Sequence, residues 1–260
     1  MSIMYDGIDL RVDGEIATVT LDRPGKMNAI SHAMWSAVPE LVAAVDADPA
    51  VKVLLLTGQG GHFSAGADIG EFRDLRSTAE GAATYDRAVT AAVRALTDLS
   101  KPSIAMIRGN CIGGGCQLAV ACDLRFAAEG ARFGITPAKL GIVYDFTSTR
   151  QLVALVGPAH ARYLLLSAQW VDAARAREMG LVNEVVDPDA LDETTAGFAR
   201  TLCSRSQTSV RGMNEIIGRI LAGQRESDAE VERIRTEAVR SADYAEGVAA
   251  FLDRRPPNFT

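Results

Sequence analysis

The chain has 260 residues, of which 48% are hydrophobic, and a formal net charge of −6 at pH 7. This composition suffices for one large folded core, and an acidic balance without a long basic run makes nucleic acids and acidic membrane surfaces poor partners. No stretch has the roughly eighteen apolar residues of a membrane helix, and the N-terminus lacks the pattern of a signal peptide, so a cytoplasmic protein is expected.

Hydrophobic alternation in the N-terminal part predicts a hairpin followed by a helix. The runs 8–12 and 16–21 flank a Gly-containing turn and indicate two antiparallel strands. Ser31 is placed as the cap of an amphipathic helix that runs to about Ala47. Because Pro39 lies inside this pattern, a kink or an early break near Val38 is expected.

The rest of the chain alternates strand and helix patterns and then becomes almost entirely helical. Ser227 with Glu230 predicts a capping box, and an apolar face at 216–221 fits either packing on the core or contact between subunits. Strands are predicted at 51–57, 103–107, 123–127, 131–134 and 181–186, and helices at 84–99, 147–156, 158–166 and 172–179. The order of these elements predicts an α/β fold with a helical C-terminal part.

Two of the predicted strands end in glycine-rich loops. The strand at 51–57 is followed by GQGGHFSAGADI, in which Asp68 can cap a short helix from Ile69, and the strand at 103–107 runs into RGNCIGGG and a helix start. Free N–H groups at such a helix start favour an anion or a developing oxyanion. A glycine turn that serves only tight packing would look the same, so each loop alone leaves both interpretations open.

Cysteine and histidine spacing gives no support to a metal site. The histidines are far apart and show no HExxH pattern, and no CxxC pair occurs, so no metal is predicted. The cysteines are expected to be reduced core residues: Cys111, Cys116, Cys122 and Cys203.

Three blocks of sequence, at 21–29, 63–69 and 109–123, resemble the crotonase superfamily, also called the enoyl-CoA hydratase/isomerase family, and the resemblance runs from about residue 8 to the C-terminus. It implies a spiral of ββα repeats with the acyl-CoA site over residues 1–200 and a C-terminal helical trimerisation region over residues 201–260. A homotrimer or a dimer of trimers is implied as well. The substrate would be an acyl-CoA thioester, with no cofactor beyond its coenzyme A.

The resemblance also assigns roles to individual residues. The backbone N–H groups of Ala67 and Gly114 match the two donors that hold the thioester oxygen as it becomes negative. Lys26 matches a CoA-contacting position, although on residue type alone it would be a solvated surface lysine. The positions implied to contact CoA or the acyl group are Lys26, Met27, Ala29, Ala65, Asp68, Ile69, Gln117, Pro137 and Leu140.

Gln117 and Pro137 occupy the positions at which the resembled hydratases carry two catalytic glutamates. An amide has no useful proton affinity near neutral pH, and proline offers no ionisable group. Hydration by a pair of glutamates is therefore disfavoured, and so is isomerisation by a single glutamate at the second position.

The loop at 141–145 supplies replacement groups. Asp145 falls where dienoyl-CoA isomerases of the superfamily carry an aspartate, but it could equally cap the helix predicted from Thr147. Tyr144 matches an active-site tyrosine of methylmalonyl-CoA decarboxylases, whose oxyanion-turn histidine is Ala67 here. Otherwise Tyr144 would be a half-buried aromatic residue with a solvated hydroxyl.

These residues favour an acyl-CoA enzyme that stabilises a thioester enolate, of the isomerase or decarboxylase-type lyase class. An enoyl-CoA hydratase that uses Asp145 and Gln117 is the first alternative, and an acyl-CoA binder without catalysis is the second. Retention of both glycine loops favours an enzyme over a binder.

Overall fold

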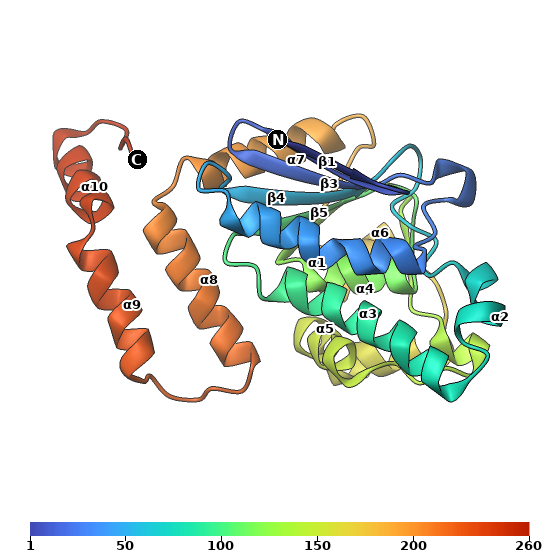
Figure 1. Cartoon of the computed structure of the whole chain (residues 1–260). Helices are drawn as coiled ribbons and strands as arrows, with labels where there is room; N and C mark the ends of the chain where they lie inside the picture. Colours follow the sequence, from blue (N-terminus) through green and yellow to red (C-terminus); the bar gives the residue numbers. More distant parts are fainter. Residues whose placement is uncertain (260) are drawn as a thin grey trace.

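The computed structural model describes residues 1–259 and is built around a twisted seven-stranded sheet (Figure 1). The strand order is β1-β2-β3-β4-β5-β7-β10, antiparallel from β1 to β3 and parallel from there on. A smaller sheet has the order β6-β8-β9. The strands are β1 (Ser2–Tyr5), β2 (Ile8–Asp13), β3 (Ile16–Leu21), β4 (Val53–Gly58), β5 (Ser103–Ile107), β6 (Asn110–Ile112), β7 (Leu124–Ala128), β8 (Arg132–Gly134), β9 (Val171–Asp172) and β10 (Glu184–Val186).

Helices cover both faces of the large sheet, so the predicted α/β class is confirmed (Figure 1). The α-helices are α1 (His32–Ala47), α2 (Phe72–Leu75), α3 (Ala79–Thr97), α4 (Gly114–Ala121), α5 (Phe146–Ser167), α6 (Ala173–Glu178), α7 (Leu191–Cys203), α8 (Gln207–Leu221), α9 (Ala229–Arg240) and α10 (Ala242–Asp253). Short 3-10 helices lie at η1 (Pro24–Lys26), η2 (Ile69–Glu71) and η3 (Pro137–Leu140).

Side-chain alternation along β4 shows how the two faces are filled. Leu54 and Leu56 belong to the main core, which includes α1, α3 and α4, whereas Val53 and Leu55 pack in a second cluster with α7. Successive residues of a strand point to opposite faces. A continuous apolar run such as VLLL therefore serves a strand that is covered on both sides.

Of the two expectations for the first helix, the early break is wrong, because α1 is continuous through Pro39, whereas the kink stays a prediction. The helix is capped by the Ser31 hydroxyl, which accepts a hydrogen bond from Met34 N. Proline inside a helix costs about 3 kcal/mol or more. Buried residues on both sides of Pro39, from Met34 to Val45, pack into the main core and outweigh this cost.

Most other predicted elements are found, with shifted bounds. Helix α3 begins at Ala79 rather than 84, because Thr78 caps it by accepting from Gly81 N. The predicted strand at 181–186 is reduced to β10, and strands β1 and β6 were not predicted. Helix α5 combines the two predicted helices across a non-helical Gly157.

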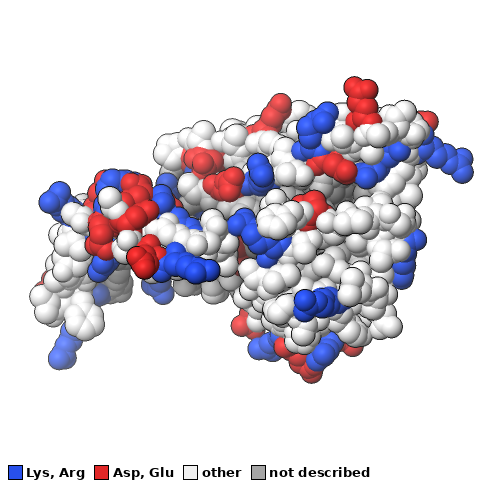
Figure 2. Space-filling view, turned by 90° about the horizontal axis from the view of Figure 1, so that it is seen from below, with Lys and Arg blue, Asp and Glu red and all other residues white. Residues whose placement is uncertain are grey.

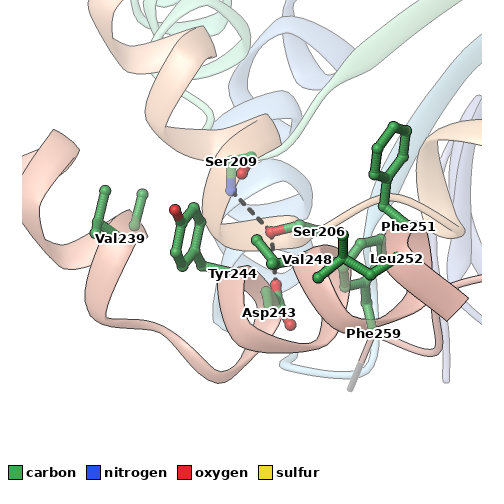
Figure 3. A pocket seen from close by; sticks show the side chains of 11 residues that line it. Ser206, Ser209, Val239, Asp243, Tyr244, Val248, Phe251, Leu252 and Phe259 are labelled. Carbon is green, nitrogen blue, oxygen red and sulfur yellow. Dashed lines mark hydrogen bonds between the residues drawn. The ribbon is translucent and has the colours of Figure 1, made fainter.

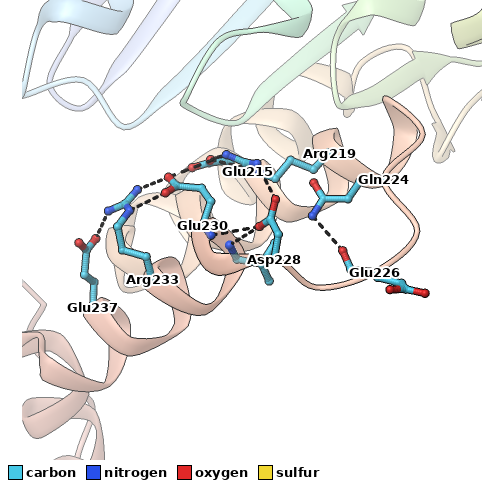
Figure 4. Close-up of polar contacts among 9 residues, drawn as sticks. Glu215, Arg219, Gln224, Glu226, Asp228, Glu230, Arg233 and Glu237 are labelled. Atoms are coloured by element: carbon cyan, nitrogen blue, oxygen red, sulfur yellow. Dashed lines mark hydrogen bonds and ion pairs between the residues drawn. The ribbon is translucent and has the colours of Figure 1, made fainter.

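The capping box predicted at Ser227 is wrong, because the residue that caps α9 is Asp228. Its Oδ1 accepts from the backbone nitrogens of Glu230 and Val231 at 3.1 and 2.9 Å. Arg219 of α8 lies 3.9 Å from Asp228 and 3.8 Å from Glu230, so ion pairs join α8 to the start of α9 (Figure 4). Acidic and basic side chains intermingle over these helices on the face seen in Figure 2.

Helices α8, α9 and α10 stand to one side of the sheet (Figure 1). The apolar face predicted at 216–221 does not pack on the core of its own chain: Ile217, Ile220 and Leu221 are each more than half exposed. A groove of about 480 Å³ lies between α8, α9, α10 and Phe259, and its lining contains none of the candidate site residues (Figure 3). Among residues 1–259, no helix combines the length and the apolar character needed to cross a membrane.

Candidate active site

The two glycine-rich loops lie against each other at the ends of β4 and β5. Ser64 N donates to Asn110 O at 2.8 Å, and Ile112 N donates to Ser64 O at 3.0 Å. Gly66 adopts φ +99°, and a Cβ there would stand 2.8 Å from Ile112 O. Only glycine tolerates this conformation together with such a close backbone approach, which explains the glycine in this loop.

Ala67 and Gly114, whose backbone N–H groups were predicted as oxyanion donors, lie next to each other. Ile30 N donates to Gly66 O, and Asp68 N donates to Ile30 O. Because Ala67 lies between these two bonded residues, its own N–H points away from Ile30, and this N–H has no hydrogen-bond partner among residues 1–259. Gly114 is the first residue of α4, where N–H groups lack an acceptor within the helix. A Cβ at Gly114 would lie 3.4 Å from Ala67 N. The first glycine loop and the start of α4 therefore bring Ala67 and Gly114 next to each other.

Lys26 and Asp68, predicted separately for the CoA site, form an ion pair. Lys26 Nζ lies 2.9 Å and Arg23 Nη2 3.0 Å from the same Asp68 Oδ2. These donors, with the Lys26 hydrogen bond first among them, hold the pKa of Asp68 below its usual value despite partial burial. Asp68 also caps η2 as predicted, by accepting from Gly70 N. Arg23 was not predicted as a site residue, although it belongs to the block at 21–29.

The other residues predicted along CoA lie next to this ion pair. Ala65 N donates to Met27 O at 2.8 Å, and the Ala29 carbonyl accepts from the Arg23 guanidinium at 2.8 Å. Met27 and Ile69 are 45% and 46% exposed, which leaves apolar side chains open to a ligand beside the charges. The structure thus brings the predicted CoA-contacting residues of the block at 21–29 and of the first glycine loop to one surface.

Asn28 connects these segments and is fully buried. Its Nδ2 donates to Gln59 O at 2.9 Å and to His62 O at 2.7 Å, and its backbone adopts the left-handed φ of 55°. Asparagine tolerates this conformation better than most residues. Its role is to hold the turn that carries Lys26 and Met27 against the first glycine loop.

Gln117 and Asp145 are brought into contact, although they are 28 residues apart in the chain. Gln117 Nε2 donates to Asp145 Oδ2 at 2.9 Å and to Ser148 Oγ at 2.6 Å. Asp145 Oδ1 accepts from Ser148 N at 3.0 Å, so Asp145 is the N-cap of α5. The cap interpretation is therefore correct, and the same carboxylate also contacts the predicted site. Ser148, which is 2% exposed, was not predicted as a site residue.

Pro137 and Leu140 form the two ends of η3, on the loop that leads to Asp145. Pro137 accepts a hydrogen bond from Ile142 N at 3.0 Å through its carbonyl, which is a structural contact. Leu140 is 51% exposed. Neither residue carries a group that could transfer a proton.

Tyr144 differs from the expectation of a solvated hydroxyl, because its hydroxyl is buried and has no hydrogen-bond partner among residues 1–259. Burial raises the pKa of Tyr144 well above its usual value. The indole N–H of Trp35 and the hydroxyl of Tyr85 are likewise buried and unpartnered. Burial raises the pKa of Tyr85 to about 12, partly offset by the adjacent Trp35 indole.

The cysteines are free and buried, as expected, and burial raises the pKa of the Cys122 thiol to about 12. A thiol with a raised pKa is a poor nucleophile at neutral pH. Among residues 1–259, no cluster of three or more His, Cys, Asp and Glu side chains is arranged to hold a metal ion.

The sequence matches known proteins over nearly its whole length. A profile of the Enoyl-CoA hydratase/isomerase family matches residues 11–260. The crotonyl-CoA hydratase of Syntrophomonas wolfei is 36% identical over 98% of this chain and 98% of that protein. The 1,2-epoxyphenylacetyl-CoA isomerase of Escherichia coli is 33% identical over 99% of both.

Solved structures agree with the sequence matches. An enoyl-CoA hydratase/isomerase family protein from Hyphomonas neptunium superposes with a TM-score of 0.95 and 38% identity, over 98% of this chain and 97% of that one. An enoyl-CoA hydratase/carnithine racemase from Magnetospirillum magneticum gives a TM-score of 0.94 and 37% identity, over 99% and 96%. The chain therefore has the crotonase fold and belongs to the enoyl-CoA hydratase/isomerase family.

Proposed function

We propose that this protein binds an acyl-CoA thioester and stabilises its enolate with the N–H groups of Ala67 and Gly114. The 3.4 Å separation between Ala67 N and the Cβ position of Gly114 supports this role, because it places the two residues next to each other, as two donors to one oxygen atom must be. Lys26, Arg23 and the exposed Met27 and Ile69 provide the charged and apolar surface that CoA requires. The acyl-CoA substrate is also what the family membership leads us to expect.

The reaction that this site supports best is an isomerisation by proton transfer. Asp145 is the carboxylate that contacts Gln117, and the two positions of the hydratase glutamates hold Gln117 and Pro137. Isomerisation of a β,γ-unsaturated acyl-CoA needs one carboxylate, which removes a proton from the α carbon and returns it to the γ carbon. The oxyanion hole holds the enolate between these two steps. The single observation that carries this proposal is the lone carboxylate beside the Gln117 amide.

A decarboxylase-type lyase is the second candidate, and the buried hydroxyl of Tyr144 is the observation that favours it. Decarboxylation produces the same enolate without a base, and a neutral hydroxyl donor could orient the departing carboxylate. The raised pKa keeps Tyr144 in its neutral, donating form. Hydration with Asp145 and Gln117, or binding without catalysis, would be the remaining outcomes.

The test has a binding arm and an activity arm. In calorimetry we expect saturable binding of butyryl-CoA and no binding of butyrate at millimolar concentration. Isomerisation of a β,γ-unsaturated acyl-CoA is followed by the absorbance of the conjugated product, and decarboxylation of methylmalonyl-CoA by release of carbon dioxide. Binding without either reaction would leave the binder interpretation in place.

An assay of crotonyl-CoA hydration distinguishes a hydratase from an isomerase or a decarboxylase. Each general acid or base contributes about a hundredfold to ten-thousandfold, so hydration without both glutamates is expected to be very slow. Rapid hydration of crotonyl-CoA would refute the proposed reaction class and support a hydratase that uses Asp145 and Gln117.

A further inference from the structure

Ser148 links the two polar residues of the candidate site. Its side chain is 2% exposed and lies in the first turn of α5. Its backbone N donates to Asp145 Oδ1 at 3.0 Å, and its Oγ accepts from Gln117 Nε2 at 2.6 Å. Gln117 Nε2 completes a closed arrangement by donating to Asp145 Oδ2 at 2.9 Å.

This arrangement fixes the orientation of the Gln117 amide. The amide nitrogen has two hydrogens, and both have acceptors in Asp145 and Ser148. The opposite end of the amide, Oε1, has no hydrogen-bond partner among residues 1–259. With Ser148 as a second acceptor, rotation of the amide would break two hydrogen bonds, one of them to a carboxylate.

We infer that Ser148 is a positioning residue, which holds the Gln117 amide so that its Nε2–H keeps the Asp145 carboxylate oriented for proton transfer at the acyl group. This role rests on the proposed acyl-CoA chemistry. The class of substrate that benefits is the β,γ-unsaturated acyl-CoA of that proposal, whose α proton the Asp145 carboxylate would remove. Ser148 itself acts through Gln117 and need not contact the substrate.

Ser148→Ala isolates the hydroxyl, because alanine keeps the backbone N–H that completes the cap of α5. Thr149→Ala is the matched control, since it also removes one hydroxyl from the first turn of α5. Unlike the Ser148 hydroxyl, the Thr149 hydroxyl makes no side-chain hydrogen bond within residues 1–259. Loss of one buried hydrogen bond changes a local equilibrium by about tenfold. Both variants are expected to fold.

The first measurement is independent of activity and uses NMR of isotope-labelled glutamine side chains. The signal of Gln117 is identified as the one missing from the Gln117→Leu variant. In the wild type we expect its two amide protons to exchange slowly with water, and in Ser148→Ala we expect faster exchange and a changed shift. Thr149→Ala should leave the signal unchanged. An identical Gln117 signal in Ser148→Ala and the wild type would overturn the assignment of Ser148.

The second measurement is a double-mutant cycle with a β,γ-unsaturated acyl-CoA as the probe. Ser148→Ala is expected to lower kcat about tenfold with little change in KM, and to have no further effect in a Gln117→Leu background. Equal decreases in both backgrounds would show that Ser148 does not act through Gln117 and would overturn the inference. If the wild type does not turn over the probe, the proposed reaction fails, and the NMR comparison still decides the role of Ser148.

Discussion

Gly114 faces the indole ring of Trp35 so closely that a Cβ on Gly114 would stand 2.7 Å from Cζ2 of the ring. Trp35 is 1% exposed and cannot move into solvent without disturbing α1. The first residue of α4 must therefore be glycine for the helix start, with its free N–H, to occupy this place.

Gly114→Ala is expected to destabilise the protein and to displace the proposed oxyanion donor. Overpacking of a buried site costs about 1–3 kcal/mol, and loss of one oxyanion donor costs about a hundredfold to a thousandfold in turnover. Urea unfolding and steady-state kinetics measure the two effects. Gly218→Ala in α8, where a Cβ meets nothing within 4 Å, is the control: it should leave turnover unchanged and raise stability by up to about 1 kcal/mol, because alanine favours a helix over glycine. Unchanged turnover in Gly114→Ala would contradict the assigned donor.

Asp145→Asn separates the capping role from the role at the Gln117 amide. Asparagine caps a helix as well as aspartate does, so the free energy of unfolding should stay within about 1 kcal/mol of the wild type. Its amide puts an NH2 donor where one of the two accepting oxygens stands, so the contact with either Ser148 N or Gln117 Nε2 is lost, and it has no carboxylate to take up a proton. Turnover is expected to fall about a hundredfold with unchanged affinity for CoA. Full activity would show that Asp145 serves only as a cap.

The ion pair between Lys26 and Asp68 predicts an acid-dependent contribution to stability. The folded-state pKa of Asp68 lies below its ordinary value of 3.8, chiefly because of the Lys26 hydrogen bond. A lowered pKa stabilises the fold above the ordinary value, and this contribution is lost as the pH falls through the folded-state pKa.

Urea unfolding between about pH 6 and about pH 2 tests this prediction. The wild type should lose more stability over this range than Lys26→Met, which lacks the main donor. Lys139→Met removes a lysine outside the ion pairs of residues 1–259 and should follow the wild type. A Lys26→Met variant with the acid dependence of the wild type would rule out the assigned cause.

Exposed apolar side chains on the C-terminal helices predict association between copies of the chain. Phe251 and Leu252 of α10 are 84% and 73% exposed, and Ile220 of α8 is 60% exposed. We expect a trimer or a dimer of trimers, as the family resemblance implies, and a shift toward monomer in Phe251→Asp. Light scattering after size-exclusion chromatography measures the mass. Met4→Asp, at an 80% exposed residue of β1, is the control and should not dissociate the assembly. A monomeric wild type would disprove this expectation.

The features that could be predicted from the amino-acid sequence depend on residues close together in the chain. The alternation in 8–21 specified the hairpin of β2 and β3, and the Ser31 cap specified the start of α1. The glycines of the two loops indicated strand ends with free N–H groups, because glycine positions and strand patterns are local signals. The family membership followed from the same short blocks.

Tertiary structure alone decided which of these residues meet. The contact of Gln117 with Asp145 and Ser148 joins two helices, and no local pattern encodes a hydrogen bond between side chains 28 and 31 residues apart. The close approach of Trp35 to Gly114 and the continuity of α1 through Pro39 likewise depend on packing between elements. Burial in a shared core can outweigh a local preference, because it sums many contacts that no single segment contains.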